Sequence, residues 1–132
     1  MKKKEKTVSQ LQKELDVLFS RHIRYSNSED GVCTCYTCGH KNEVKKMHAG
    51  HYITRFFKTT RWDERNVKPQ CFMCNIYRKG NAVLFRQNLV RDYGLPAVEE
   101  MEKSVNFLLR GGLKREWLEE KIAYYKEKTK NI

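Results

Sequence analysis

Two Cys-x₂-Cys pairs lie in the middle of the chain, Cys35–Cys38 and Cys71–Cys74, with 32 residues between Cys38 and Cys71. A two-residue spacer lets one tight turn direct both sulfurs at one ion, and Gly39 permits such a turn after the first pair. Four thiolates at tetrahedral angles suit Zn²⁺ and leave no open coordination position. The spacing therefore predicts a structural zinc site and not a catalytic one.

The fifth cysteine, Cys33, competes with this assignment. On a strand it would share a face with Cys35, and we assign it to the core or the surface and not to the metal. Five cysteines also fit a secreted disulfide scaffold, but the chain begins Met-Lys-Lys-Lys-Glu-Lys and no apolar signal segment follows. Metal-bound thiolates in a reducing cytoplasm are therefore expected.

The central segment of the chain, which contains both cysteine pairs, is too polar to build a core unaided. Its large aliphatic residues between Gly31 and Gly80 are Val32, Val44, Ile53, Val67 and Ile76. A metal cross-link would supply the folding free energy that packing cannot.

His48 and His51 lie between the cysteine pairs, and Asn75 directly follows the last cysteine. Phosphodiester hydrolysis needs a base that deprotonates water and a hard divalent cation that polarises the phosphate. Histidine titrates near neutrality and can act as the base, and the carbonyl oxygen of Asn75 can bind a hard cation. Taken alone, the two histidines also fit surface groups or competing zinc ligands. Their placement between the cysteine pairs favours a nuclease site.

These residues resemble the zinc-anchored HNH, or ββα-metal, nucleases. A narrower resemblance, to the NinG/Rap recombination proteins of lambdoid phages, covers roughly residues 30–95. It rests on Cys35-x₂-Cys38-Gly39, Ala49-Gly50-His51-Tyr52, Arg61-Trp62-Asp63-Glu64-Arg65-Asn66, Gln70-Cys71-x₂-Cys74-Asn75 and Gly80-Asn81. The arrangement is also similar to the phage endonuclease VII resolvases. The resemblance implies a structure-selective DNA endonuclease that acts on Holliday junctions and D-loops in the host cytoplasm.

The resemblance also implies a role for each site residue. His51 matches the general base and Asn75 the metal ligand on the helix, while Asn66 matches the residue that holds the loop and orients the base. His48 stands where NinG-like sequences tend to have Asp, and imidazole is a poorer ligand for Mg²⁺ than a carboxylate. We expect His48 and Asn75 to hold a catalytic Mg²⁺ or Mn²⁺. Asp63 or Glu64 could supply the carboxylate that is missing at position 48. Asn81 is either a further site residue or a helix cap.

The chain carries 27 Lys and Arg against 16 Asp and Glu, a net charge of +11. This surplus favours a polyanionic partner, although a merely solvated surface has the same composition. Phe56 and Phe57 either stack on an unpaired base or form a small core under their loop, and Trp62 is assigned to the core. The basic residues expected to contact DNA phosphates are Arg55, Lys58, Arg61, Arg65, Lys68, Arg78 and Lys79.

Helical periodicity marks the flanks of the chain. Apolar residues recur at three- and four-residue spacing after Thr7, which can form a capping box with Gln10. Later helices are expected from Cys71 to Gly94 with a break at Gly80-Asn81, from Pro96 to Gly111-Gly112, and from Leu113 onward. The predicted fold is α+β and one structural unit, made of a basic tail and helix (1–29), a zinc-bound ββα-metal core (30–94) and a helical extension (95–132).

Two other functions fit the same sequence. A non-catalytic zinc-ribbon DNA-binding module would not need the histidines, and a zinc-stabilised protein adaptor would show no salt-sensitive affinity for DNA. No stretch approaches the roughly 18 apolar residues of a membrane span, so no membrane partner is expected. A homodimer through the C-terminal helices would suit symmetric cutting of a four-way junction, but apolar stripes fit packing within one chain equally well.

Overall fold

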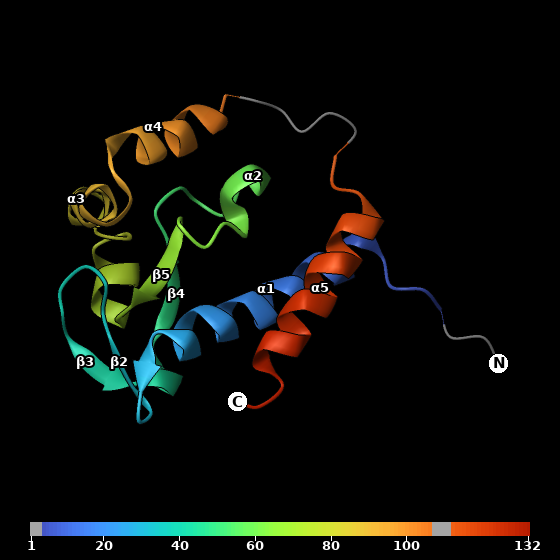
Figure 1. Ribbon diagram of the computed structural model, residues 1–132, viewed down its shortest axis with the longest axis horizontal. Helices are drawn as coiled ribbons and strands as arrows, with labels where there is room; N and C mark the ends of the chain where they lie inside the picture. The colour runs from blue at the N-terminus through green and yellow to red at the C-terminus, as the bar shows by residue number, and fades with distance from the viewer. Residues whose placement is uncertain (1–3, 107–111) are drawn as a thin grey trace.

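The computed structural model describes residues 4–106 and 112–132, so the helix end predicted at Gly111 lies outside the described residues. Helices surround two small antiparallel sheets (Figure 1). The first sheet has the order β1 (Ser28–Glu29), β2 (Val32–Thr34) and β3 (Lys41–Glu43), and the second pairs β4 (His48–His51) with β5 (Val67–Gln70). The predicted α+β class is therefore confirmed.

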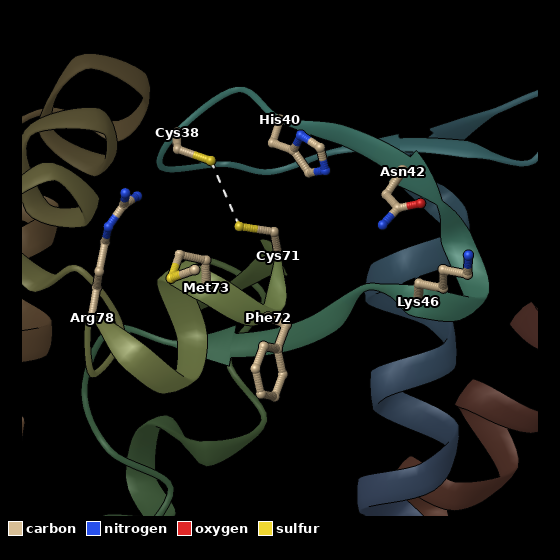
Figure 2. Close-up of a pocket in the computed structure, with 8 residues that line it drawn as sticks. All are labelled: Cys38, His40, Asn42, Lys46, Cys71, Phe72, Met73 and Arg78. Atoms are coloured by element: carbon tan, nitrogen blue, oxygen red, sulfur yellow. Dashed lines mark hydrogen bonds between the residues drawn. The ribbon is translucent and has the colours of Figure 1, made fainter.

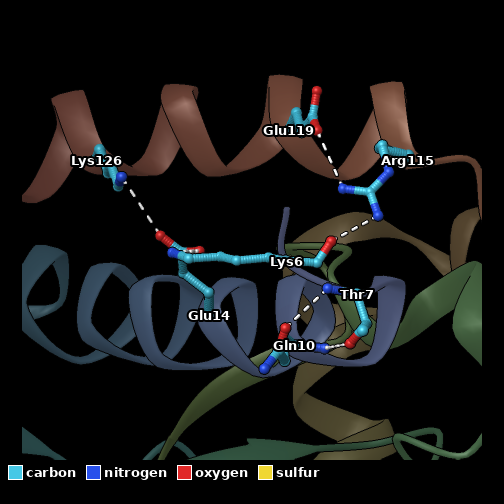
Figure 3. Close-up of polar contacts among 7 residues, drawn as sticks. All are labelled: Lys6, Thr7, Gln10, Glu14, Arg115, Glu119 and Lys126. Carbon is cyan, nitrogen blue, oxygen red and sulfur yellow. Dashed lines mark hydrogen bonds and ion pairs between the residues drawn. The ribbon is translucent and has the colours of Figure 1, made fainter. Parts of the chain in front are cut away.

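Helix α1 (Val8–Ser26) begins with the predicted capping box. The Gln10 amide donates to Oγ1 of Thr7 over 3.1 Å, and the Thr7 amide donates to Oε1 of Gln10 over 2.8 Å (Figure 3). Two of the amides that a helix start leaves unpaired are thus satisfied reciprocally. The buried face of the helix consists of Leu11, Leu15, Phe19 and Ile23.

Helix α5 (Arg115–Thr129) packs along α1 in the same direction, so both ends of the sequence share one core (Figures 1 and 3). Phe19 and Tyr125 meet edge to face with ring centroids 5.2 Å apart. At the rim, Lys126 lies 3.3 Å from the Glu14 carboxylate. The described core also contains Leu118, Ile122, Val67 and Trp62, which confirms the core assignment of Trp62. The apolar stripe of α5 is therefore covered within the chain.

Strands β4 and β5 pair with His48 opposite Gln70 and His51 opposite Val67. The predicted strand from Glu43 to Ile53 is shorter than expected, because a 3₁₀ turn, η1 (Val44–Lys46), precedes β4. The helix expected after Cys71 is a single π-helical turn, η2 (Met73–Tyr77). Gly80 and Asn81 then take positive φ angles of 89° and 49°, which confirms the predicted break before α3. The order along the chain is therefore β4, a loop that contains a short helix, β5 and then η2.

Helices α3 (Ala82–Tyr93) and α4 (Leu95–Ser104) form a second hydrophobic layer on the loop after β4. Its buried members are Ile53, Phe85, Leu89, Val98 and Met101. Phe57 packs partly against this cluster, whereas Phe56 is 80% exposed. The loop from Arg55 to Trp62 contains one short helix, α2 (Lys58–Arg61). Across the residues described, no helix is both long and apolar enough to cross a bilayer.

Candidate functional site

The four cysteines of the two pairs converge on one point, with their sulfurs all within 4.8 Å of one another. The Sγ atoms of Cys38 and Cys71 are 3.7 Å apart. Zn–S bonds of about 2.3 Å at tetrahedral angles place sulfurs about 3.8 Å apart, so the geometry and the donor set both fit zinc. Cys33 lies outside the cluster, with its sulfur 3.7 Å from the carbonyl oxygens of Arg24 and Asn27. The four cysteines can therefore hold a structural zinc ion.

Each cysteine pair, with its turn, forms what we call a knuckle. In the first knuckle, the Gly39 amide donates a hydrogen bond to the Cys35 carbonyl over 3.0 Å. Gly39 has a φ of +78°, a conformation that glycine adopts without strain. Burial alone would raise the pKa of Cys35. The Thr37 hydroxyl and the backbone amides of Cys38, Cys71 and Thr37 outweigh it and lower that pKa to about 6. These hydrogen bonds therefore favour the thiolate, the form of cysteine that binds metal.

Asn81, considered from the sequence as a further site residue or a helix cap, and Arg78, expected to contact DNA, both lie against a cysteine sulfur, a contact that the sequence did not predict. Asn81 occupies the N-cap position of α3 without capping it, and its amide instead donates to the Cys74 sulfur over 3.6 Å. Arg78 donates to the same sulfur over 3.5 Å. Both contacts stabilise negative charge on the thiolate. The sequence signal that could have predicted these contacts is a hydrogen-bonding residue within a few positions after the last cysteine.

Gln70 links the knuckles to the β4–β5 pair. Its side chain is fully buried and donates to the Thr37 hydroxyl over 3.1 Å and to the Gly80 carbonyl over 2.9 Å. Its Oε1 has no hydrogen-bond partner among the residues that the structure describes and lies against Gly50, where an added Cβ would stand 1.9 Å from it. The close approach of strand and side chain therefore requires glycine at position 50.

Replacing Gly50 with alanine should destabilise the fold by more than about 3 kcal/mol, because Gln70 must move and lose both hydrogen bonds. Chemical denaturation followed by circular dichroism measures this loss. Ala49→Gly, at the neighbouring position, is the matched control and should cost about 1 kcal/mol. A Gly50→Ala protein as stable as the parent would contradict the close contact.

His51 contacts the loop between the two strands. Its Nε2 lies 2.9 Å from the Arg61 carbonyl oxygen, so Nε2 carries the hydrogen and Nδ1 keeps its lone pair. Burial lowers the pKa of His51, and the bond to the Arg61 carbonyl offsets this only in part. The ring is therefore neutral at pH 7 and holds one basic nitrogen, as a general base requires.

Asn66 fixes the loop that carries this carbonyl. Its buried side chain donates to the carbonyls of Ile53 (3.0 Å) and Thr60 (3.1 Å) and accepts from the Ile53 amide over 2.8 Å. These bonds join the start of the loop to the residue directly before Arg61. The side-chain amide of Asn66 thus uses its N–H groups and its oxygen to bind backbone groups of the loop.

Asp16 of α1 holds the same loop from outside. It accepts hydrogen bonds from Nε of Arg61 (3.0 Å), Nε1 of Trp62 (2.9 Å) and Nη2 of Arg55 (3.0 Å). One carboxylate therefore fastens the segment whose carbonyl contacts His51. Sequence reasoning missed Asp16, since nothing near it in the chain indicates this partner.

His48 and Asn75 are brought together, with Nδ2 of Asn75 2.9 Å from Nδ1 of His48. Side chains alternate along a strand, so His48 and Gly50 face η2, whereas Ala49 faces the α1 core with His51. No hydrogen bond among the described residues joins His51 to His48 or Asn75. The predicted site is therefore arranged around β4, with the base on one side and the two candidate ligands on the other.

The two acidic residues suggested as substitutes for His48 are already engaged. Asp63 binds Arg65 over 2.8 Å. Glu64 accepts from Tyr125 over 3.1 Å and pairs with His22 over 3.0 Å. Neither carboxylate is brought to His48 by these contacts.

The basic residues expected to bind DNA fall into two groups. Arg55 and Arg61 pair with Asp16, and Arg65 pairs with Asp63, so these three arginines hold the loop. The remaining four form no ion pair with any described residue: Lys58, Lys68, Arg78 and Lys79. Lys68 donates to the Tyr93 hydroxyl and Arg78 to the Cys74 sulfur, so Lys58 and Lys79 are the least engaged of the four.

Comparison with known proteins gives the family. The family model described as "Bacteriophage Lambda NinG protein" matches residues 1–132. Protein ninG of Escherichia phage 933W is 33% identical over 113 residues, covering 82% of this chain and 52% of that protein. Protein ninG of Escherichia phage lambda is 32% identical over 113 residues, with the same coverage of 82% and 52%. Protein ninG of Salmonella phage P22 is 35% identical over 79 residues, covering 59% of this chain and 38% of that protein.

The chain spans about half the length of the first two of these relatives. No solved structure is significantly similar to it. The match along the whole chain and the shared identity with several relatives agree with one another. The chain belongs to the family of the bacteriophage lambda NinG protein.

Proposed function

We propose that this NinG-family chain is an HNH-type, metal-dependent DNA endonuclease whose catalytic unit is β4, β5 and η2. The observation that carries the proposal is the geometry of His51. Its Nε2 is held by the Arg61 carbonyl at 2.9 Å, its pKa is lowered by burial, and Nδ1 is left as the basic nitrogen. Such a histidine can take a proton from water at neutral pH.

The residues around His51 have positioning roles in this proposal. The Arg61 carbonyl keeps the tautomer and stabilises the imidazolium formed when Nδ1 takes the proton. Asn66 and Asp16 fix the loop on which that carbonyl lies, through the hydrogen bonds described above. Fixing the base in this way lowers the reorganisation needed at the moment of reaction.

His48 and Asn75 would hold the catalytic divalent ion. They lie on the other face of β4 from His51, so the DNA strand would have to pass the free edge of this two-stranded sheet for one phosphate to meet both the ion and the base. An imidazole nitrogen beside an amide group fits a borderline ion such as Mn²⁺ better than Mg²⁺. When bound, the ion supplies Lewis acidity to a phosphate and lowers the energy of the departing oxygen. The four thiolates serve the separate, structural zinc.

Branched DNA is the substrate that we propose. The resemblance to the phage resolvases supports this class, and the net charge of +11 supports a polyanion in general. Lys58, Lys68 and Lys79, which form no ion pair with a described residue, would meet phosphates, so affinity should fall steeply as salt concentration rises.

The test is cleavage of a four-way junction, a D-loop and a linear duplex by the zinc-loaded protein, with Mg²⁺, Mn²⁺ or no added ion. We expect cutting that depends on the added ion and is faster on the branched substrates. Salt-sensitive binding of DNA without any cutting would instead favour the second function, a non-catalytic zinc-ribbon DNA-binding module. If the protein shows no affinity for DNA, the result would favour the third function, a zinc-stabilised protein adaptor. Sedimentation with and without junction DNA tests the homodimer.

A further inference from the structure

An apolar patch lies on the surface of η2. Phe72 is 51% exposed, Met73 49%, Ile76 51% and Tyr77 70%, although a small chain needs most of its apolar side chains for its core. The aromatic rings are ordered against one another, with Phe72 5.6 Å from Tyr77 and 5.8 Å from His48 between centroids. Contiguous exposed apolar surface of this kind marks an interaction site more often than scattered single residues do.

A cavity of about 550 Å³ opens beside this patch. Its volume is within the roughly 300–1,000 Å³ of pockets that take small organic ligands. Figure 2 shows Phe72 and Met73 along one side, Cys38 and His40 along the other, and Arg78 and Lys46 at opposite ends. The cavity therefore has an apolar wall in the middle and a cation at each end.

We propose that this cavity binds an unpaired nucleotide of DNA, with its base stacked on Phe72 and the flanking phosphates at Arg78 and Lys46. Stacking on an aromatic ring is available to any base, and the cations match the backbone on either side of it. The bases of an intact duplex offer no free face. The cavity would therefore recognise an unpaired nucleotide of DNA without distinguishing one base from another.

This inference rests on the proposed function and gives it a means of selecting branched substrates. The ring of Phe72 contacts His48, one of the two candidate ligands of the catalytic ion. A nucleotide held in the cavity would thus lie next to the site at which a phosphate is cut. A second copy of this chain is a poorer occupant, because it would bring two net charges of +11 together across a rim that is itself basic.

The experiment compares Phe72→Ala and Tyr77→Ala with the parent protein. Tyr124→Ala is the matched control, since Tyr124 is 48% exposed on α5. Dissociation constants are measured at one salt concentration for a gapped duplex, with 2-aminopurine as an unpaired base, and for the same duplex fully paired. Zinc content is measured on every variant. Tyr77 lies outside the knuckle and its ring packs against that of Phe72. Tyr77→Ala should therefore weaken binding of the gapped duplex selectively but by a smaller factor, and it serves if Phe72→Ala disturbs zinc binding.

We expect Phe72→Ala to weaken binding of the gapped duplex by about tenfold to a hundredfold, the effect of losing one base–aromatic stack. Binding of the paired duplex should change less than twofold, and quenching of 2-aminopurine should be lost. Equal weakening on both DNAs, or no weakening on either, would overturn the inference while leaving cleavage by the parent intact. Conversion of a dimer to a monomer by Phe72→Ala would also overturn it. Failure of the parent to bind any DNA would end both proposals.

Discussion

Serine in place of Cys74 is expected to remove zinc from the protein and to unfold both knuckles. The buried cluster here consists mostly of sulfur-bearing residues, with Val44 as its one aliphatic member among the residues described. Structural zinc contributes about 10–16 kcal/mol to small domains, as much as the roughly 5–15 kcal/mol of a whole domain's stability. Metal analysis should show less than one zinc per chain, and thermal unfolding should lose its cooperative transition or begin at a much lower temperature. Strong chelators should have the same effect on the parent.

The matched control is Cys33→Ala. Cys33 is as buried as Cys74, but its sulfur lies against the backbone carbonyls of Arg24 and Asn27 and is not part of the four-sulfur cluster. This variant should keep one zinc per chain and lose about 1 kcal/mol of unfolding free energy. Full zinc content in Cys74→Ser, or loss of zinc from Cys33→Ala, would contradict the assignment of the ligands.

Short-range patterns carried the correct predictions about this fold. The Thr7–Gln10 capping box depends on residues three apart, and the break at Gly80-Asn81 depends on two adjacent residues. The cysteine spacing likewise predicted the cluster, because each turn fixes two sulfurs locally. The capping box and the break depend on contacts within a few positions of one another. The meeting of the two cysteine pairs, 33 positions apart, follows instead from the need of one ion for four thiolates.

Long-range pairing could not be read from the sequence. The packing of α5 on α1 joins segments from opposite ends of the chain, and Asp16 meets Arg61 across 45 positions. Arg55 and Arg61 therefore looked like free phosphate ligands although they hold a loop. One feature was open to prediction: residues three apart on a strand face opposite sides, which separates His48 from His51.

Replacement of His51 is the decisive change for the proposed chemistry, and His51→Ala should lower kcat by about 10²- to 10⁴-fold, the usual contribution of a general base. The dissociation constant for junction DNA should change little, because no cation is removed. His22→Gln is the matched control, since His22 contacts Glu64 and Tyr125 and not the Arg61 carbonyl that holds His51, and it should keep its activity within about twofold.

The pH dependence of kcat/KM tests the same assignment. Only neutral His51 can take a proton, and burial lowers its pKa below the ordinary value of about 6.5. Activity should therefore rise with pH through a midpoint below about 6.5 and be flat near pH 7–8. A midpoint well above 7 would assign the base to another group.

His51→Gln separates catalysis from folding. The side-chain amide of glutamine can still donate to the Arg61 carbonyl, which now accepts from Nε2 over 2.9 Å, but it cannot take a proton at pH 7. We expect parental thermal stability and junction affinity together with the kcat of His51→Ala. Cutting by His51→Gln at near the parental rate would show that His51 holds the loop and that the chemistry lies elsewhere. Equal loss of stability in both variants would give the histidine a structural role alone.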